Sequence, residues 1–188
     1  MDIVSEIKKF VEEECKKPTA VYDFEIIKYH FIPVVKHALT LAEQRGADKE
    51  IVELSAWLHD IGGVIYGREN HHATGAEVAE KKLKELNYPD DKINKIKDCI
   101  FSHRGSQVIN RTSEEAKILA EADAMSHFDA LPGLFRAFFV CEKKDGQGRA
   151  GQEVKQKLIN SYNKLSEDAK EIIKPKFDAA MLLLNNLE

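Results

Sequence analysis

The sequence contains few cysteines and no long apolar run. Its three cysteines, Cys15, Cys99 and Cys141, are far apart and form no Cys-x-x-Cys pair, so a disulfide framework and a thiolate zinc site are both disfavoured. The longest apolar runs, Ala137–Cys141 and Ala179–Leu184, are far shorter than the roughly 20 residues that a membrane-spanning helix needs. The sequence therefore predicts a protein with reduced cysteines that does not act at a membrane.

A secretion signal and an excess of basic charge are also missing. The N-terminal segment MDIVSEIKKFVEEE carries acidic residues where a signal peptide needs a bare apolar segment. Lys and Arg number 28 against 32 Asp and Glu, giving a net charge of −4, whereas general nucleic-acid binders are usually basic. We therefore expect a cytoplasmic protein that binds no nucleic acid; the oligomeric state is not indicated.

The spacing of apolar residues is helical, and no segment alternates as a β-strand does. Ile3, Ile7, Phe10 and Val11, for example, fall on one face of a helix. The 188 residues, 43% of them apolar, are one domain's worth of chain. The sequence predicts an all-α fold, a single domain over residues 1–188 built as a bundle of about eight or nine helices.

Glycine, proline and capping residues delimit the expected helices. Pro33 interrupts a helical stretch from about Tyr22 to Arg45, so we expect a break near Phe31, and Gly46 is typical of a helix C-terminus. The other internal helices are expected at about 48–61, 71–87, 90–102, from 112 or 113 through 124, 131–144, 152–165 and 167–186, with a loop at 63–70 and a kink at Pro175.

A His-Asp dipeptide stands at the end of one of these helices. His59 and Asp60 follow the apolar segment Leu54–Leu58, which predicts that the helix packs against the core. Burying such a pair is costly unless another group pairs with it. At a helix end the backbone can turn, so both side chains can converge on one ligand.

Four other residues complete a set of candidate metal ligands. His37 and Asp123 lie in apolar helical segments, His71 opens a helix and His103 closes one. Each residue alone is more often structural than functional. Together with the His-Asp pair, however, they form a mixed nitrogen and oxygen donor set that suits a divalent transition metal.

The order His37, His59-Asp60, Asp123 resembles that of the HD-domain metal-dependent phosphohydrolases, which are named after the His-Asp dyad. Ile61-Gly62 follows the dyad here, as in many members. The segments HHATGA (71–76) and IFSHRG (100–105) are similar to two further patterns, His-x-x-x-Gly-Ala and Ile-x-x-His-Arg-Gly. The resemblance covers about residues 30–130.

The resemblance implies an all-α fold with one or two divalent ions per chain. In members with a second ion, the dyad aspartate bridges the two ions. The choice among Mn, Fe, Co, Ni, Zn and Mg stays open. For this sequence, the family's ligands would be His37, His59, Asp60 and Asp123 for the first ion and Asp60, His71 and His103 for the second.

Three further residues bear on substrate and catalysis. Asp60 would orient the attacking water through the metal or a hydrogen bond. Arg104 is expected to pair with the substrate phosphate, or else is a solvated cation whose role passes to the loop 63–70 or to Lys143, Lys144 and Arg149. His71 rather than His72 fits the offset to Gly75, so His72 is expected as a substrate contact or a surface residue.

The sequence departs from the family at Gly63, where many members carry a lysine. His30 and His127 have no place in the pattern and are interpreted as structural or surface residues.

The resulting hypothesis is a metal-dependent phosphohydrolase, a phosphomonoesterase or phosphodiesterase. Its substrate would be a small phosphate ester, most plausibly a nucleotide or related metabolite, and its nucleophile a metal-activated water. Two alternatives stay open. An HD-fold di-iron oxygenase would use the same histidines, and a non-catalytic nucleotide-sensing module would bind without turnover.

Overall fold

The computed structural model describes residues 2–104, 110–141 and 150–185. Within these ranges the chain is helical and contains no strand, so the all-α prediction is confirmed. No helix in the described ranges is long and apolar enough to cross a membrane. The elements are α1 (Ile3–Lys16), η1 (Ile27–Phe31), α2 (Ile32–Arg45), α3 (Lys49–Leu58), α4 (Ile61–Tyr66), α5 (His71–Glu85), α6 (Asp90–Ser102), α7 (Glu114–Ser126), α8 (Leu131–Arg136), η2 (Ala137–Cys141), α9 (Ala150–Tyr162) and α10 (Glu167–Leu184).

Several helix ends are set by the residues that the sequence indicated. Asp48 precedes α3, and its carboxylate accepts hydrogen bonds from the backbone N–H groups of Glu50 and Ile51. The Ser113 hydroxyl accepts one from the Ala116 N–H at the start of α7. Gly46 ends α2 with a φ of 67°, a left-handed conformation that glycine adopts without strain. The expected ends at Ser113 and Gly46 are thus confirmed.

The expected break before α2 takes the form of a π-helical segment. In η1 the hydrogen bonds skip one residue more than in an α-helix, and the N–H of Ile32 binds the carbonyl of Ile27. Pro33 follows in the first turn of α2 and has no N–H to donate. Such π-segments are frequent at functional sites, and this one contains His30.

The region after the His-Asp dyad differs from its prediction. The expected loop 63–70 is wrong over its first half, because α4 continues the helical path to Tyr66. Gly62 and Gly63 have low helix propensity, but both are buried, and tertiary packing outweighs that propensity. Downstream, the predicted helix 131–144 divides into α8 and η2, and residues 142–149 lie outside the described ranges. The helix α10 runs through Pro175.

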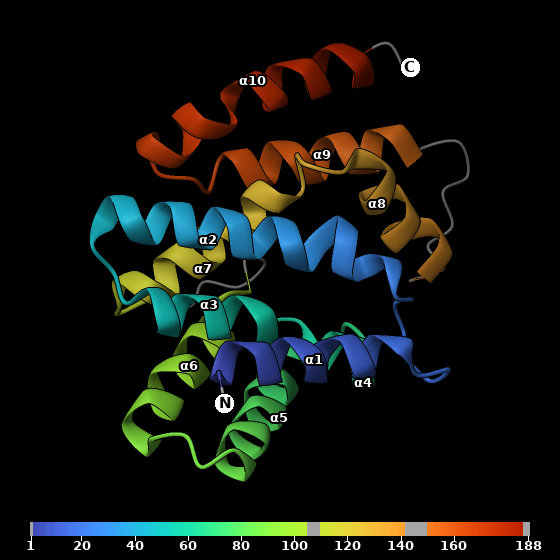
Figure 1. Cartoon of the computed structure of the whole chain (residues 1–188). Helices are drawn as coiled ribbons and strands as arrows, with labels where there is room; N and C mark the ends of the chain where they lie inside the picture. The colour runs from blue at the N-terminus through green and yellow to red at the C-terminus, as the bar shows by residue number, and fades with distance from the viewer. Residues whose placement is uncertain (1, 105–109, 142–149, 186–188) are drawn as a thin grey trace.

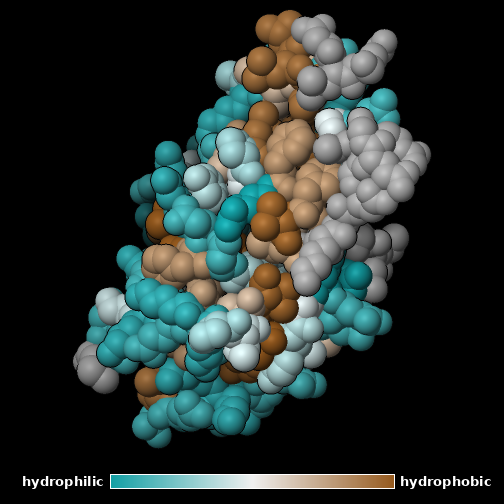
Figure 2. Space-filling view, turned by 90° about the vertical axis from the view of Figure 1, so that its right-hand side faces the viewer, coloured by the Kyte–Doolittle hydropathy of each residue, from teal (hydrophilic) through white to brown (hydrophobic). Residues whose placement is uncertain are grey.

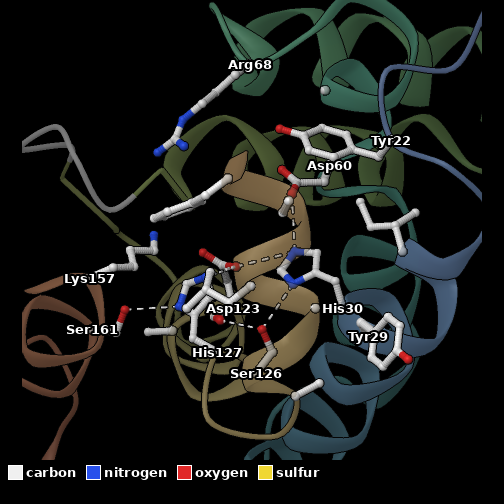
Figure 3. Close-up of a pocket in the computed structure, with 18 of the residues that line it drawn as sticks. Tyr22, Tyr29, His30, Asp60, Arg68, Asp123, Ser126, His127, Lys157 and Ser161 are labelled. Atoms are coloured by element: carbon white, nitrogen blue, oxygen red, sulfur yellow. Dashed lines mark hydrogen bonds and ion pairs between the residues drawn. The ribbon is translucent and has the colours of Figure 1, made fainter. Parts of the chain in front are cut away.

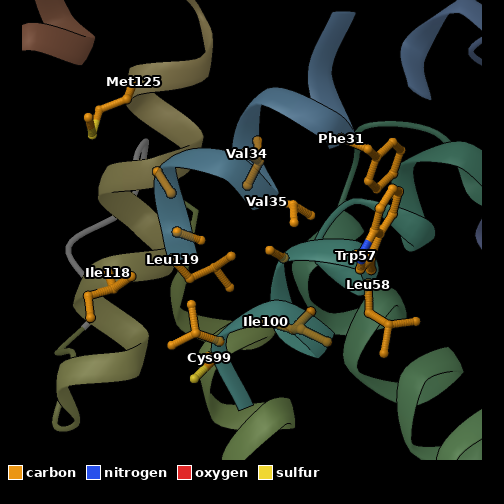
Figure 4. Close-up of a cluster of buried hydrophobic side chains, with 14 of the residues drawn as sticks. Phe31, Val34, Val35, Trp57, Leu58, Cys99, Ile100, Ile118, Leu119 and Met125 are labelled. Carbon is orange, nitrogen blue, oxygen red and sulfur yellow. The ribbon is translucent and has the colours of Figure 1, made fainter. Parts of the chain in front are cut away.

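In Figure 1, α2 crosses the middle of the molecule, with α9 and α10 on one side of it and α1, α3, α5 and α6 on the other. The helix α2 packs against α3 and α7, and α5 packs against α4 and α6. Buried apolar side chains from these helices form the core shown in Figure 4, where the rings of Phe31 and Trp57 stack with centroids 6.4 Å apart. Figure 2 shows apolar residues running down the middle of the face turned to the viewer, with hydrophilic residues on its left.

Candidate metal centre

The dyad lies at a turn between two helices. The helix α3 ends at Leu58, and α4 begins at Ile61, so His59 and Asp60 are the two residues that join them. A close crossing of α4 and α5 fixes this turn: a Cβ on Gly62 would lie 2.4 Å from the His71 carbonyl oxygen and 2.5 Å from the Gly75 nitrogen. Only glycine fits there, which explains the Gly after the dyad.

The first group of candidate ligands comprises His30, His59, Asp60 and Asp123. Figure 3 shows His30, Asp60 and Asp123 of this group. Nε2 of His30 lies 3.0 Å from Nε2 of His59 and 3.2 Å from Oδ2 of Asp60. Oδ1 of Asp123 is 3.6 Å from the same His30 nitrogen. These side chains come from η1, from the α3–α4 turn and from α7, so three distant segments converge.

The second group uses the other oxygen of the same aspartate. Oδ1 of Asp60 lies 3.5 Å from Nε2 of His71 and 3.5 Å from Nε2 of His103. Those two nitrogens are 3.3 Å apart. Asp60 therefore faces both groups, one oxygen toward each.

Hydrogen bonds at the opposite ring nitrogens determine which tautomer each histidine adopts. Nδ1 of His59, His71 and His103 lies 2.8, 2.9 and 2.5 Å from the carbonyl oxygens of Ala56, Arg68 and Ile100. A carbonyl only accepts, so each Nδ1 carries a hydrogen, and Nε2 of each ring is the nitrogen directed inward, where it can bind an ion.

A hydrogen bond with Ser126 fixes the orientation of the His30 ring. The Ser126 hydroxyl donates to the carbonyl of Asp123 at 2.7 Å, so it accepts from Nδ1 of His30 at 3.1 Å. Nε2 of His30 is therefore also the nitrogen directed toward His59 and Asp60.

This donor set fits divalent ions. Two imidazole nitrogens 3.0 Å apart, as in His30 and His59, need a proton or a metal ion between them. Two histidines that bind one ion through bonds of about 2.0–2.1 Å would have their nitrogens about 2.9–3.4 Å apart, and both histidine pairs fall in this range. Carboxylate oxygens on the same ions would offset their charge.

Burial and the neighbouring charges shift the pKa values of the centre in opposite directions. Burial lowers the pKa of His59 to about 4, so this imidazole is neutral near pH 7. Burial also opposes ionisation of Asp60, but the neighbouring histidines, His59 first, hold the pKa of this carboxyl well below its usual range. The carboxylate in turn raises the pKa of His30 against the effect of burial. The dyad thus combines a neutral donor with an ionised one.

The structure does not bring His37 to this centre, and its predicted place with the dyad is wrong. His37 is buried two helical turns further along α2, where Nε2 pairs with the Asp129 carboxylate. That carboxylate also pairs with Lys176 of α10, so His37 helps to hold the loop after α7. His30 occupies the place expected for His37. His30, which the sequence indicated as a structural or surface residue, instead contacts His59 and Asp60.

Some of the remaining residues expected from the sequence line the cavity over the centre, and others lie outside it. Arg104 and Gly63 line a cavity of about 690 Å³ that opens over both groups, and so does His127, which lies 3.9 Å from Asp123. His72 does not line that cavity. It is buried beside Phe101, with ring centroids 5.2 Å apart, so the expected substrate contact by His72 is wrong. Lys143, Lys144 and Arg149 lie outside the described residues.

The same residues match a known family. The model of the HD domain covers residues 27–127, more than half of the chain. The chain belongs to the HD-domain family. An uncharacterised protein of Clostridium beijerinckii is 30% identical over 101 residues, which are 52% of this chain and 62% of that protein. This chain therefore spans less than two thirds of that relative's length.

Solved structures share the HD-domain fold over nearly the whole chain. Bacillus subtilis YpgQ in complex with ADP is 17% identical, with a TM-score of 0.69, and the match covers 98% of this chain and 96% of that one. A predicted HD-superfamily hydrolase from an uncultured Thermotogales bacterium is 21% identical with a TM-score of 0.64, covering 96% and 88%. At these identities the likeness concerns the fold.

Proposed function

We propose that this HD-domain protein is a metal-dependent phosphohydrolase that acts on a small phosphate ester, a nucleotide or a related metabolite. The observation that carries the proposal is the pair of histidine groups that share Asp60, whose two oxygens face His30 at 3.2 Å and His71 at 3.5 Å. The ligands assigned are His30, His59, Asp60 and Asp123 for one ion and Asp60, His71 and His103 for a second.

The chain's own residues prepare the centre for this chemistry. When bound, divalent ions of this kind activate water as a nucleophile and offset charge on phosphoryl oxygens. The backbone carbonyls that accept from Nδ1 of His59, His71 and His103 fix the orientation of those rings and direct Nε2 inward. Asp60 bridges the two groups and orients the attacking water. Arg104, on the cavity wall, is assigned to the phosphate.

A nucleotide substrate is supported by the size of the cavity and by one relative. The cavity of about 690 Å³ is within the range of small-molecule sites, about 300–1,000 Å³. The similar structure of YpgQ is a complex with ADP.

The test is phosphate release by protein stripped with a chelator and reloaded separately with Mn²⁺, Fe²⁺, Co²⁺, Ni²⁺, Zn²⁺ or Mg²⁺. We expect at least one metal to restore phosphate release from a panel of nucleotides, phosphomonoesters and phosphodiesters. Asp60→Asn should abolish this release. The matched control is Asp178→Asn, which removes a carboxylate paired with Lys174 at the surface.

The alternatives give other results. Oxygen uptake by the iron-loaded protein without phosphate release would indicate an oxygenase. Nucleotide binding without turnover by any metal-loaded form would indicate a sensing module.

A further inference from the structure

One histidine of the cavity lies beside the first ligand group without belonging to it. His127 follows the last residue of α7, one helical turn after Asp123, and lines the cavity. Its ring is nearly parallel to that of His30, with centroids 6.1 Å apart. Nε2 of His127 lies 3.9 Å from Oδ1 of Asp123, so this nitrogen faces the edge of the metal centre.

A hydrogen bond with α9 fixes the ring of His127. Its Nδ1 lies 3.0 Å from Oγ of Ser161, and Ser161 is buried, with an exposed fraction of 2%. Figure 3 shows the contacts that run from Ser161 through His127 to Asp123. Ser161 therefore sets the direction in which Nε2 of His127 points.

The carboxylate of Asp123 determines which nitrogen of His127 carries the hydrogen. Burial opposes ionisation of Asp123, but the surrounding histidines hold the pKa of its carboxyl below the usual range, so the group is an anion near pH 7. An anion attracts an N–H group and repels a lone pair. A neutral His127 therefore carries its hydrogen on Nε2, and the Ser161 hydroxyl donates to Nδ1. A charged ring would carry hydrogens on both nitrogens, so Nε2 is a donor in either state.

The hydrogen on Nε2 has no acceptor close enough within the protein. A separation of 3.9 Å is too long for a hydrogen bond to Asp123, and no other residue in the described ranges accepts from this nitrogen. The His127 side chain is only 10% exposed, and a donor left unpaired at such a site is destabilising. The cavity beside Asp123 is therefore suited to a ligand that supplies an acceptor.

A phosphoryl oxygen fits this requirement. Such an oxygen carries negative charge, and a hydrogen bond to a charged acceptor is about twice as strong as one between neutral groups. Donors that are already fixed in direction stabilise such an oxygen without having to reorient. The contact with Ser161 gives His127 that fixed direction.

We propose that the Nε2–H group of His127 donates a hydrogen bond to a phosphoryl oxygen of the substrate, and that Ser161 is the positioning residue that directs this group. His127 then binds substrate rather than metal, although it lies one helical turn from a proposed metal ligand. This inference rests on the proposed function, because the Asp60 centre brings the phosphoryl group to this part of the cavity.

The test measures binding of inorganic phosphate to the metal-loaded protein by calorimetry. His127→Phe should weaken phosphate binding about ten- to a hundredfold, the effect of losing one charge-assisted hydrogen bond. His127→Gln should recover part of this affinity, because its side-chain amide offers an N–H donor from the same position. His72→Phe, at a buried histidine outside the cavity, should bind phosphate as the wild type does.

Ser161 is tested through its dependence on His127. Ser161→Ala should weaken phosphate binding about two- to tenfold, whereas Ser55→Ala, at a buried serine of α3, should not. In the double variant His127→Phe with Ser161→Ala, the serine change should have no further effect, because Ser161 acts through the ring. The comparison of Ser161→Ala with Ser55→Ala also decides the proposal if His127→Phe does not fold.

Metal content separates a substrate contact from a metal ligand. The metal-to-protein ratio should be the same in all of these variants, and loss of metal in His127→Phe would make His127 a ligand and overturn the proposal. Wild-type phosphate affinity in His127→Phe or in Ser161→Ala would overturn it too, as would a His127→Gln variant that binds as weakly as His127→Phe or a wild type that binds no phosphate.

The substrate contact and the proposed function fail separately. Weaker phosphate binding by His127→Phe, in a protein that releases no phosphate from any ester, would keep the contact and refute the phosphohydrolase. Phosphate release by the wild type, together with wild-type phosphate affinity in His127→Phe, would refute the contact alone.

Discussion

Nε2 of His30 lies 3.0 Å from Nε2 of His59. Ser126 and the Ala56 carbonyl occupy the opposite nitrogens of the two rings, so both Nε2 atoms are directed inward. Two such nitrogens need either a shared proton or a metal ion between them. The relationship assigns the first ligand to η1, although the sequence pattern pointed to α2.

The second group predicts a separate loss of metal. His71→Ala or His103→Ala should lower the metal-to-protein ratio from about two toward about one, because each removes a nitrogen that faces Oδ1 of Asp60 and leaves the His30 group intact. His72→Ala is the control, since its ring lies outside the cavity. Elemental analysis after gel filtration checks this. Loss of metal in His72→Ala alone would place the ligand one residue later.

The crossing of α4 and α5 predicts a steric effect at one of two adjacent glycines. Gly62→Ala should destabilise the protein by about 1–3 kcal/mol, because its Cβ would lie 2.4 Å from backbone at His71. Gly63→Ala should be neutral or stabilising by up to about 1 kcal/mol, because its Cβ would meet only ordinary contacts of 3.6 and 3.7 Å. Urea unfolding compares them. Equal stability of the two variants would contradict the packing described.

Arg104 is predicted to bind the phosphate at the Asp60 centre. Arg104→Ala should lower kcat/KM about ten- to a hundredfold, the effect of losing one charge-assisted hydrogen bond. Arg104→Lys should recover only part of this, because a point charge cannot make the two-pronged contact. Metal content should not change. Wild-type kinetics in Arg104→Ala would mean that Arg104 is only a solvated cation, and the phosphate partner would then be sought on the loop 63–70 or at Lys143, Lys144 and Arg149.

A surface ion-pair network predicts a pH-dependent stability. Arg45 of α2 binds Asp168 of α10 through two nitrogens, at 2.9 and 3.0 Å. This guanidinium, then the Ser166 hydroxyl, lowers the pKa of Asp168 to about 2. Because the folded pKa lies below the ordinary value of about 3.9, the contribution is complete above about pH 4 and disappears as the pH falls toward 2.

Asp168→Asn should therefore reduce the free energy of unfolding near neutral pH and have progressively less effect in acid. The Asp168 side chain is 47% exposed, so we expect a difference below about 1 kcal/mol. Urea unfolding at about pH 6 and about pH 2.5 measures it, with Asp178→Asn as an exposed control. A difference that grows in acid would contradict the sign.

The sequence predicted the all-α fold because helical spacing and capping residues are local signals, whereas its candidate ligands came from the resemblance to the HD-domain family. It correctly placed His71 rather than His72 beside the dyad aspartate, since the offset to Gly75 reflects the packing of α5 on α4. The sequence placed His37 with the dyad, but the structure places His30 there. The two residues are seven positions apart, about two helical turns, so they fall on the same face of a helix, and helical periodicity does not tell which turn faces the dyad. Pro33 signalled the irregular turn that carries His30, but only tertiary packing shows where that turn points.

The residues of α9 that line the cavity, Lys157 and Ser161 among them, had no comparable signal. Lys157 lies beyond about residue 130, where the family resemblance ends, on a helix that the sequence indicates only by its apolar spacing. The convergence of α9 with α7 is a tertiary contact, which no local pattern encodes.

The most direct test of the metal centre compares His30→Ala with His37→Ala by elemental analysis of the purified proteins, with circular dichroism to confirm that each is helical. His30→Ala should lose the metal of the first group and the phosphate release that depends on it. His37→Ala should keep its metal and only become less stable, because it loses the contact with Asp129. Full metal occupancy in His30→Ala together with loss of metal in His37→Ala would contradict the account.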